Sequence, residues 1–477
     1  MGDEMSLAIR LGDATTSQQL LNVVTLKNPK DFPIAATVSK NGTVNIDSAS
    51  LRLDELPDRG IWTIRVRFTD LSPWTSYTYS IVQDGKSIDG SFQTLPDNQT
   101  TPFSFIIGTC DGPNPTNPTN TYKTIRQVVE NSTIPVLHMF IIDDVHYADN
   151  FTVDDPTTGF VSTGLPQDTG LAGDYAKSWA ANYGLIPSEP KWMMPDRQWV
   201  YRNISCSYSG GDHAIASNWC RGDANPEGHD RMSKDCMRGP GSLEDVAGSE
   251  WDSFFGNINP DPLRAGQWYW GKEMGPVKMT LWDMSKTCEP FDSRLPTDTQ
   301  CYGAQQISDH MKYLDVDTHP FKIGLHESGL TLMGQPWLEF HRTEAEAWYK
   351  DFITRPNLNG SNGSFVSIYG DNHTVHTLKL DDFWVWSPGT LGDARAVGGI
   401  NAFNPDRSWG WGGIPKYGES SSKLIGDRFI HNFTMVTVHA DKSPMYIDIA
   451  HIDGGRGVVK YSARLIHKSI KNQMVEL

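Results

Sequence analysis

The chain of 477 residues has no apolar run that approaches the roughly 18 residues of a transmembrane helix, so the sequence predicts no membrane span. It also lacks an excess of positive charge. The 41 Lys and Arg stand against 57 Asp and Glu, for a formal net charge of −16. Proteins that bind the nucleic-acid backbone display basic surfaces, so this composition argues against such a partner. The acidic excess suits a protein that collects cations.

A signal peptide is not visible at the start of the chain, because MGDEMSLAIR has neither a basic segment nor an apolar core. N-glycosylation acceptors are nevertheless abundant, where about three are expected by chance. The acceptor asparagines are Asn41, Asn98, Asn131, Asn150, Asn203, Asn359, Asn362, Asn372 and Asn432. We therefore expect a secreted glycoprotein in an extracellular or periplasm-like compartment, whose signal peptide has been removed. The alternative is a polar, loop-rich chain with accidental acceptor sites.

Cysteine is scarce, with six in the chain. Cys288 and Cys301 bracket a short polar loop and are candidates for a disulfide bond. Cys220 is a second candidate, with Cys206 or Cys236 as its partner. Spacing alone leaves the connectivity open.

Residues 1–97 predict an N-terminal β-sandwich domain of the fibronectin or immunoglobulin type. The segment IWTIRVRFTDL (61–71) alternates apolar and polar residues, as a half-buried strand does. SYTYSIVQDGKSIDGSFQTL (76–95) predicts two strands around an Asp-Gly turn. DLSPWTSYTYSI (70–81) resembles the corner of fibronectin-type sandwiches, where a leucine and a tyrosine brace the last strands.

Residues 98–477 predict a larger α/β domain. FSFIIGTC (103–110) and PVLHMFIIDDVHYADN (135–150) are apolar strands that end in polar residues, and the helical pattern TYKTIRQVVEN (121–131) lies between them. Strand, helix, strand indicates a parallel core. Few periodic segments occur over 150–205, which we interpret as a surface elaboration or lid. The remaining predicted elements are helices near 305–316 and 344–354 and a hairpin over 432–453.

Four segments share one form, in which an apolar strand is followed at once by ligand-type side chains. They are FIIGTCDG (105–112), FIIDDVHYADN (140–150), SGGDHAIASNW (209–219) and SIYGDNHTVH (367–376). In open α/β sheets the binding crevice lies at the carboxyl ends of the strands, so these residues are expected at one edge. Carboxylates placed that close repel one another unless a cation lies between them. The pattern therefore predicts a metal centre, and a bridging carboxylate would make it binuclear.

Each residue alone has a plainer interpretation. An aspartate at a strand end often forms a turn, a lone histidine is usually a satisfied polar group, and Cys110 alone would be a small buried hydrophobe. The repetition of the pattern in four segments favours the metal centre.

The motifs resemble the alkaline phosphatase D (PhoD-like) branch of the metallophosphoesterases over nearly the whole chain, and in the same order. GTCD resembles the family's Ser-Cys element, and DDVHYAD resembles its Gly-Asp-x-x-Tyr motif. GDHAIASNW resembles the Asp-His-Glu and Asn-Asn block, and YGDNHTVH resembles Gly-Asp-x-His. LWDMSKT and YGAQQISDHMKYL are similar to the family's Leu-Asp-x-Arg and Leu-Gly-x-x-Gln segments.

The resemblance implies a four-layer α/β/β/α metallophosphoesterase sandwich after the N-terminal β-sandwich, with metals at the strand ends. It implies an Fe(III) and Ca²⁺ centre, with Zn²⁺ or Mn²⁺ as alternatives. The implied metal ligands are Cys110, Asp144, Tyr147 and His373 for iron, with Asp144 bridging to calcium, and Asp371 and Asn218 for calcium. His213 would face the substrate phosphate and assist the leaving group, and Asp212 would be its catalytic neighbour or a further calcium ligand.

The chain also departs from the family pattern. Asp143 replaces the motif glycine, and Gly211 and Ala214 stand where Asp and Glu flank the Asp-His pair. Ser217 takes the place of one asparagine, and Ser285 stands where an arginine is expected. These changes spare the implied iron ligands and concern the second-metal side.

We expect a secreted alkaline-phosphatase-like hydrolase that cleaves small phosphate monoesters by attack of a metal-bound hydroxide or oxide. A phosphodiesterase or phospholipase D activity is the alternative within the same family. A non-catalytic glycoprotein that kept the scaffold is the alternative outside it, favoured modestly by Ala214 and Ser285. The sequence leaves the natural ester and the oligomeric state open.

Overall fold

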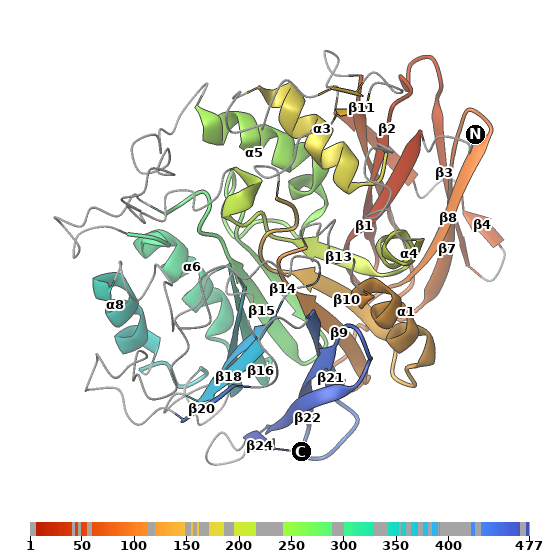
Figure 1. Cartoon of the computed structure of the whole chain (residues 1–477). Helices are drawn as coiled ribbons and strands as arrows, with labels where there is room; N and C mark the ends of the chain where they lie inside the picture. Colours follow the sequence, from red (N-terminus) through yellow and green to blue (C-terminus); the bar gives the residue numbers. More distant parts are fainter. Residues whose placement is uncertain are drawn as a thin grey trace.

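The protein is a mixed α/β structure in the parts of the chain that the computed structural model describes. Figure 1 shows the whole arrangement. The described residues are 6–40, 43–45, 49–54, 60–111, 120–147, 154–155, 160–161, 171–185, 195–215, 242–288, 300–327, 342–352, 354–358, 364–370, 375–379, 384–389, 391, 421–424, 431–467 and 474–476.

The first eight strands form two four-stranded sheets, with orders β1-β2-β6-β5 and β4-β3-β7-β8. Side chains of both sheets fill one core, to which Leu11 and Val66 belong from the first sheet and Val38 and Ile81 from the second. The strands are β1 (Leu7–Ala14), β2 (Gln19–Thr25), β3 (Ile34–Lys40), β4 (Thr43–Asn45), β5 (Ala49–Asp54), β6 (Trp62–Phe68), β7 (Ser76–Gln83) and β8 (Lys86–Gln93).

Two local predictions in this region are confirmed. The Asp-Gly turn joins β7 to β8 with φ angles of 48° at Asp84 and 71° at Gly85, the positive values that a two-residue hairpin turn needs. At the predicted corner, the Tyr77 hydroxyl accepts a hydrogen bond from the Ser72 N–H at 2.8 Å. Leu71 and Tyr77 are both buried there.

Two seven-stranded sheets form most of the remaining structure. Their orders are β13-β10-β9-β21-β22-β23-β24 and β14-β15-β16-β17-β19-β18-β20, and a short β11–β12 ladder stands apart. The first sheet contains β9 (Phe103–Gly108), β10 (Val136–Ile141), β13 (Ser205–Tyr208), β21 (Asn432–His439), β22 (Tyr446–Asp453), β23 (Val459–Ile466) and β24 (Met474–Glu476). The second contains β14 (Trp270–Met274), β15 (Val277–Trp282), β16 (Phe321–His326), β17 (Ser364–Tyr369), β18 (Val375–Lys379), β19 (Trp384–Pro388) and β20 (Ser421–Leu424). The ladder pairs β11 (Asp154–Asp155) with β12 (Phe160–Val161).

Parallel pairing dominates where the sequence predicts a βαβ unit. Strands β9, β10 and β13 are parallel neighbours, and so are β15, β16 and β17. The expected hairpin over 432–453 is also present, because β21 pairs with β22 in antiparallel register. Parallel strands align their carboxyl ends, which brings the ends of β9, β10 and β13 to one edge.

The two large sheets share one apolar core. Phe105, Phe140 and Ile449 contribute from the first sheet, and Met279 and Ile323 contribute from the second. The rings of Phe140 and Trp270 lie 6.0 Å apart across the two sheets. Near-continuous apolar runs in these strands are what burial on both faces requires.

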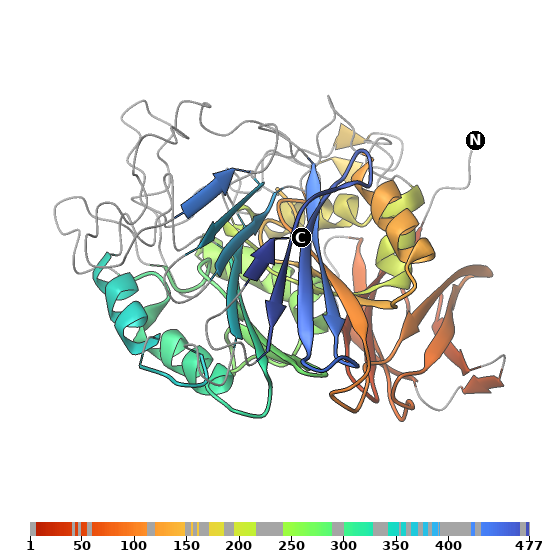
Figure 2. The same cartoon turned by 90° about the horizontal axis from the view of Figure 1, so that it is seen from below.

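Helices cover the outer sides of these sheets. In Figure 2, α6 and α8 lie at one end of the molecule and the N-terminal strands lie at the other. α1 packs against α4, α3 against α5, and α6 against β15. The α-helices are α1 (Thr121–Asn131), α3 (Ala172–Asn182), α4 (Pro195–Asn203), α5 (Leu243–Phe254), α6 (Gly303–Leu314) and α8 (Arg342–Phe352), and the 3₁₀ helices are η3 (Asp212–Ala214) and η4 (Gly256–Ile258). Among the described residues, no helix is both long enough and apolar enough to cross a membrane, as the sequence predicts.

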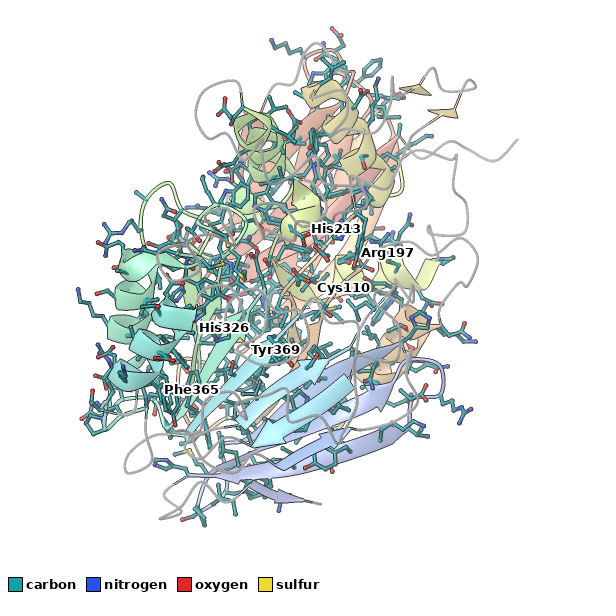
Figure 3. All side chains as sticks on the ribbon, turned by 60° about the vertical axis from the view of Figure 1, so that its left-hand side comes forward. Cys110, Arg197, His213, His326, Phe365 and Tyr369 are labelled. Carbon is teal, nitrogen blue, oxygen red and sulfur yellow. The ribbon has the colours of Figure 1, made fainter. Side chains whose placement is uncertain are left out.

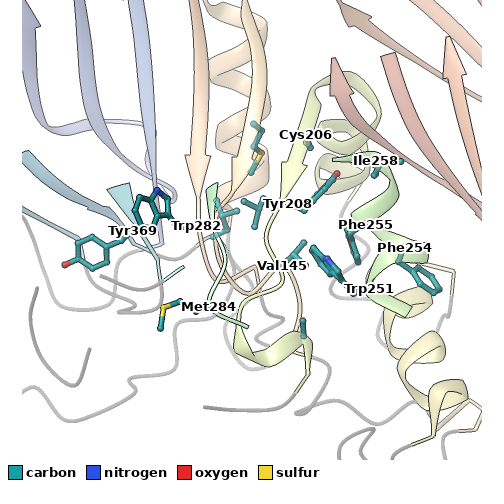
Figure 4. Packing of buried hydrophobic residues seen from close by; sticks show 14 of the residues in the cluster. Val145, Cys206, Tyr208, Trp251, Phe254, Phe255, Ile258, Trp282, Met284 and Tyr369 are labelled. Carbon is teal, nitrogen blue, oxygen red and sulfur yellow. The ribbon is translucent and has the colours of Figure 1, made fainter. Parts of the chain in front are cut away.

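The prediction of a surface elaboration or lid over 150–205 is wrong for α3, most of whose residues are buried. Trp179 of α3 is fully buried, and its ring lies 5.9 Å from that of Trp251 and 5.0 Å from that of Phe255. Figure 4 shows the core around Trp251 and Phe255. The helix AGDYAKSWAAN is built largely from small residues, so it packs closely without the wide apolar stripe by which such helices are recognised.

The cysteines give a mixed outcome. Cys206 is a buried free thiol that donates to the Ile204 carbonyl at 3.3 Å, which argues against its pairing with Cys220. Cys288 and Cys301 are buried in the same apolar core, but no disulfide bond joins these two described residues, so that expected pairing is not found. Cys220 and Cys236 lie outside the described residues.

Candidate metal centre

The candidate site lies where β9, β10 and β13 end. Backbone pairing continues past the strands, because the N–H groups of Cys110 and Asp111 donate to the carbonyls of Asp143 and Asp144 at 3.0 and 2.8 Å. On the other side of β10, the Ser209 N–H donates to the Ile141 carbonyl at 2.7 Å. Three segments that are far apart in the sequence therefore leave the sheet side by side.

Two residues of these segments have left-handed backbone conformations. The φ angle is 51° at Cys110 and 38° at Asp144, and neither residue is glycine. Such conformations cost about 1–3 kcal/mol each and cluster at functional sites. The turn at each strand end is therefore held in place by the surrounding structure, and each presents a potential metal ligand.

Ligand-type atoms converge in two groups. The first comprises the Cys110 thiol and the carboxylates of Asp143 and Asp144. The second comprises Asp144, Asp212 and His213, and within each group the ligand atoms lie within 4.8 Å of one another. Asp144 belongs to both groups, which is the place that a bridging carboxylate takes in a binuclear centre. Figure 3 labels Cys110 and His213 in the middle of the molecule.

Two glycines make room for the aspartates. A Cβ on Gly211 would lie 2.1 Å from Asp144 Oδ1 and 2.7 Å from Asp143 Oδ1, and the φ of Gly211 is 64°. A Cβ on Gly370 would lie 2.3 Å from the Cβ of Asp143. Glycine is therefore required at both positions for this close packing.

Burial distinguishes the members of the site. Cys110, Asp143, Asp144 and Asp212 are buried, whereas His213 is half-buried. The His213 N–H donates to Asp144 Oδ1 at 3.3 Å. Of the ligand-type side chains described here, His213 is the one placed to meet a molecule that arrives from solvent.

Tyr147 lies beside His213, with the ring centroids 4.2 Å apart. Its side chain is buried. The tyrosine predicted as an iron ligand is thus in contact with the site, next to the histidine predicted to act on the substrate.

Three predicted ligands lie outside the described residues: Asn218, Asp371 and His373. Strand β17, which precedes Asp371 and His373 in the sequence, nevertheless ends at the site. Gly370 follows β17 and packs against Asp143, and its N–H donates to the His326 carbonyl at 3.0 Å. The chain therefore enters the Asp371 segment beside the first ligand group.

Two acidic residues of the site area were not predicted as site residues. The sequence places Asp143 among the ligand-type side chains that follow a strand, but the family motif has glycine there, so no metal-ligand role is implied for it. In the structure its carboxylate lies beside Cys110, whose thiol is 3.5 Å from Asp143 Oδ2. Glu327 follows β16 and accepts hydrogen bonds from Gly211, Met284 and Ser285 backbone N–H groups at 3.2, 2.6 and 3.2 Å. The segment FKIGLHE (321–327) has the same strand-then-carboxylate form as the four segments and could have revealed it.

The serine that stands where arginine is expected supports this arrangement. The Ser285 hydroxyl lies 2.7 Å from the Gly211 carbonyl and 3.2 Å from Glu327 Oε2. Ser209 also donates its hydroxyl to Glu327. Ser285 therefore joins the end of β15 to the glycine that packs against Asp144.

A second layer of polar contacts fixes the loop after β10. The Arg10 guanidinium has only donors, so the Asn182 side-chain atom that contacts it must be the amide oxygen. The Asn182 amide N–H then donates to His146 Nδ1 at 3.1 Å. His146 Nε2 then carries the proton and donates to Ser178 Oγ at 2.6 Å. Burial, followed by the charges of Arg197 and Arg10, lowers the pKa of His146 well below its usual value, so this imidazole is neutral.

The loop after β9 is held by a buried ion pair. Arg197 donates to Asp111 Oδ2 at 2.7 Å, and the Tyr201 hydroxyl donates to the same oxygen at 2.5 Å. Both donors come from α4. Asp111 follows Cys110 directly, so α4 positions the thiol-bearing turn.

Comparison with known proteins leaves the family undecided. No family model matches the chain, and comparison with curated proteins gives no significant match. Among solved structures, the sensor domain of the anti-sigma factor RsgI4 from Pseudobacteroides cellulosolvens is 17% identical, with a TM-score of 0.17, over 20% of this chain and 99% of that one. Astrotactin-2 is 10% identical, with a TM-score of 0.16, over 42% of this chain and 34% of that one.

Amylomaltase from Corynebacterium glutamicum is 11% identical, with a TM-score of 0.16, over 75% of this chain and 65% of that one. TM-scores this low support no statement about fold or function. The function is therefore inferred from the residues of the site itself.

Proposed function

We propose that the protein is a metal-dependent phosphoric ester hydrolase of the alkaline phosphatase D type, acting on small phosphate monoesters. The observation that carries the proposal is the pair of ligand groups that share Asp144. A thiol, three carboxylates and an imidazole from three strand ends are a donor set for two cations. Without cations these buried carboxylates would repel one another.

The donor chemistry fits one soft and one hard site. The Cys110 thiolate and the neighbouring Tyr147 favour a transition metal such as Fe(III), with Zn²⁺ or Mn²⁺ as alternatives. Asp144, Asp212 and the predicted ligands Asn218 and Asp371 offer the oxygen atoms that Ca²⁺ prefers. When bound, such ions bind the phosphoryl group, activate water and stabilise charge on the leaving oxygen.

The residues of the chain have separate tasks in this proposal. The buried carboxylates hold and orient the cations and keep bulk water out of the centre. His213 is half-buried and lies at the rim, where its imidazole can bind a phosphate oxygen and transfer a proton to the leaving oxygen. Gly211 permits the close approach of the Asp212–His213 turn to Asp144.

The proposal includes the fold implied by the sequence resemblance. The two facing seven-stranded sheets with helices outside them support a four-layer metallophosphoesterase sandwich. The two small N-terminal sheets support a separate β-sandwich domain that ends near residue 97. A truncated chain that begins near residue 98 would test that boundary by its folding.

Hydrolysis of p-nitrophenyl phosphate at alkaline pH tests the proposed function. We expect turnover that a chelator abolishes, that added metal restores, and that Asp144→Ala lacks. Bis-p-nitrophenyl phosphate, assayed in parallel, distinguishes a diesterase from a monoesterase. Stoichiometric metal binding without turnover of either ester would overturn the proposal in favour of a non-catalytic metal-binding glycoprotein.

Secretion is a further part of the proposal. Asn98 and Asn131 are exposed and accessible to glycosylation, whereas Asn432 in β21 is 1% exposed and is blocked by the fold. Protein from a secreting eukaryotic host should lose mass on treatment with an N-glycosidase. Peptide mapping that found the sites at Asn98 and Asn131 unmodified would count against secretion.

A further inference from the structure

A small cavity lies between the first strand and two helices, behind the candidate site. It is lined by Arg10 of β1, Asn182 at the end of α3, and Arg197 and Tyr201 of α4. The space in it that is open to the centre of a water-sized sphere is about 10 Å³, which is room for a single species of about the size of a water molecule. A phosphate group is too large for it.

Two buried guanidinium groups border this cavity, and each has an N–H without an acceptor. Arg10 is 2% exposed and donates from Nη2 to the Asn182 carbonyl at 2.8 Å, while its Nη1 has no hydrogen-bond partner in the described structure. Arg197 is 8% exposed and donates to Asp111, while its Nε has no partner among the described residues. A buried donor left without an acceptor is costly, and a species bound in the cavity that both side chains line would supply the acceptor.

Charge distinguishes the two species that would fit, a water molecule and a monatomic ion. The side chains around the cavity include two guanidinium cations, those of Arg10 and Arg197. The carboxylate of Asp111 pairs with Arg197 and also accepts from the Tyr201 hydroxyl. The acceptors of Arg10 on Asn182 are neutral, and its guanidinium stacks over the Tyr201 ring at 3.8 Å. A water molecule would satisfy the free N–H groups but would leave the excess positive charge, and a buried uncompensated charge is costly.

We propose that this cavity binds one monatomic anion, chloride under ordinary conditions. The anion accepts hydrogen bonds from Arg10 and Arg197 and neutralises the excess charge. It stabilises the contact between the N-terminal strands and the helices that hold the site loops, because Asn182 contacts His146 and Arg197 contacts Asp111. The proposal does not depend on the hydrolase activity.

Thermal unfolding of the full chain at constant ionic strength tests the proposal, with sodium chloride exchanged for sodium gluconate. Gluconate is too large for the cavity. We expect the unfolding temperature to rise by about 2–3 °C from about 5 mM to about 500 mM chloride. Arg10→Gln should abolish this dependence on chloride, whatever its own stability. An unfolding temperature that is the same in both salts for the wild type would overturn the proposal.

Lys272→Met is the matched control. Lys272 is another buried cation that joins the N-terminal strands to the large sheets, but it is paired with Asp13 and the Ala14 carbonyl and does not line the cavity. This variant should lose stability and keep the chloride dependence. Loss of the dependence in this variant as well would show a general salt effect and overturn the proposal.

Crystals soaked in bromide give a direct readout that needs no variant. We expect one anomalous peak per chain between Arg10 and Arg197. An ordinary water peak there, without anomalous signal, would show that the cavity is hydrated and would overturn the proposal.

Discussion

The carboxylate of Glu327 accepts a hydrogen bond from the Gly211 N–H at 3.2 Å, and this bond joins the ends of strands from the two facing sheets. Glu327 follows β16 of one sheet, and Gly211 follows β13 of the other. The same carboxylate accepts the N–H groups of Met284 and Ser285. Gly211 packs against Asp144, so Glu327 acts on the candidate centre through the position of that glycine.

Replacing Glu327 with Ala should therefore weaken metal binding as well as the fold. The N–H groups of Gly211, Met284 and Ser285 would lose their acceptor, which should lower the unfolding free energy by about 1–3 kcal/mol. The shift of the Gly211 turn should reduce metal affinity by roughly 10–100-fold, as is common when a group that supports a ligand is lost. Denaturant unfolding and metal titration measure the two effects separately.

Asp283→Asn is the matched control for Glu327. Asp283 is also a buried acid at a strand end, but burial, followed by the charge of Glu327, raises its pKa well above the usual value. An asparagine resembles the neutral carboxyl that results, so we expect little loss of metal affinity. Equal losses in both variants would show that Glu327 has no special part in holding the Gly211 turn.

Gly211→Ala should impair the site beyond its cost to the backbone. The new methyl group would lie 2.1 Å from Asp144 Oδ1, so the Asp212–His213 turn must move away from the carboxylate. Gly266→Ala is the control, because Gly266 has a φ of 78° and nothing within 4 Å of an added Cβ. Both variants carry a backbone cost of about 1 kcal/mol in unfolding free energy, and metal affinity should fall in Gly211→Ala alone. Metal affinity at the wild-type level in Gly211→Ala would contradict the described packing.

Cys110→Ala should remove the visible absorption of the iron-reconstituted protein that comes from thiolate ligation. Cys206→Ala is the control, since Cys206 is also fully buried but burial raises the pKa of its thiol to about 12, so it stays protonated. The spectrum of this variant should match that of the wild type. An unchanged spectrum in Cys110→Ala would show that the Cys110 thiol is not an iron ligand and would favour Zn²⁺ or Mn²⁺ as the bound metal.

Acid should destabilise the fold in part through His326. Burial lowers the pKa of this imidazole to about 3, against about 6.5 in an unfolded chain. Above pH 6.5 the group is neutral in both states and has no effect on stability. As the pH falls from about 6.5 to about 3, the unfolded chain binds a proton that the folded chain does not. The unfolding free energy should then drop by about 1.4 kcal/mol per pH unit.

His326→Phe removes this titration and keeps an aromatic ring against Trp282, whose ring lies 4.8 Å from that of His326. The unfolding free energy of the variant should depend less steeply on pH between about 6.5 and 3. Parallel curves for the variant and the wild type would show that the imidazole binds its proton in the folded state as readily as in the unfolded chain, and would contradict the lowered pKa.

The local elements follow closely from the sequence. The helix predicted over 121–131 has those bounds in the structure, and the Asp84-Gly85 turn and the 432–453 hairpin are where the patterns place them. These features depend on neighbouring residues: apolar periodicity, an Asp-Gly pair and alternation in a strand. The α3 helix was missed because its small residues are buried on most sides and give no clear stripe.

The site could be predicted only in part. Strand ends that carry Cys110, Asp144 and Asp212 are visible in the sequence, since each is an apolar run followed by ligand-type residues. The grouping of Asp143 with Cys110 and the role of Glu327 could not be predicted, because both depend on which strand ends meet. Asn218, Asp371 and His373 lie outside the described residues and stay predictions.

The sequence by itself determined the kind of strand, turn and side chain that each segment offers, because these depend on a few residues that are close along the chain. Only the tertiary structure decided that Asp144 is shared by two ligand groups, that Gly211 and Gly370 admit the aspartates, and that Arg10 borders a cavity with Arg197. These relations join segments more than thirty positions apart in the sequence. They follow from the parallel register of β9, β10 and β13 and from the packing of two sheets, which no local pattern encodes.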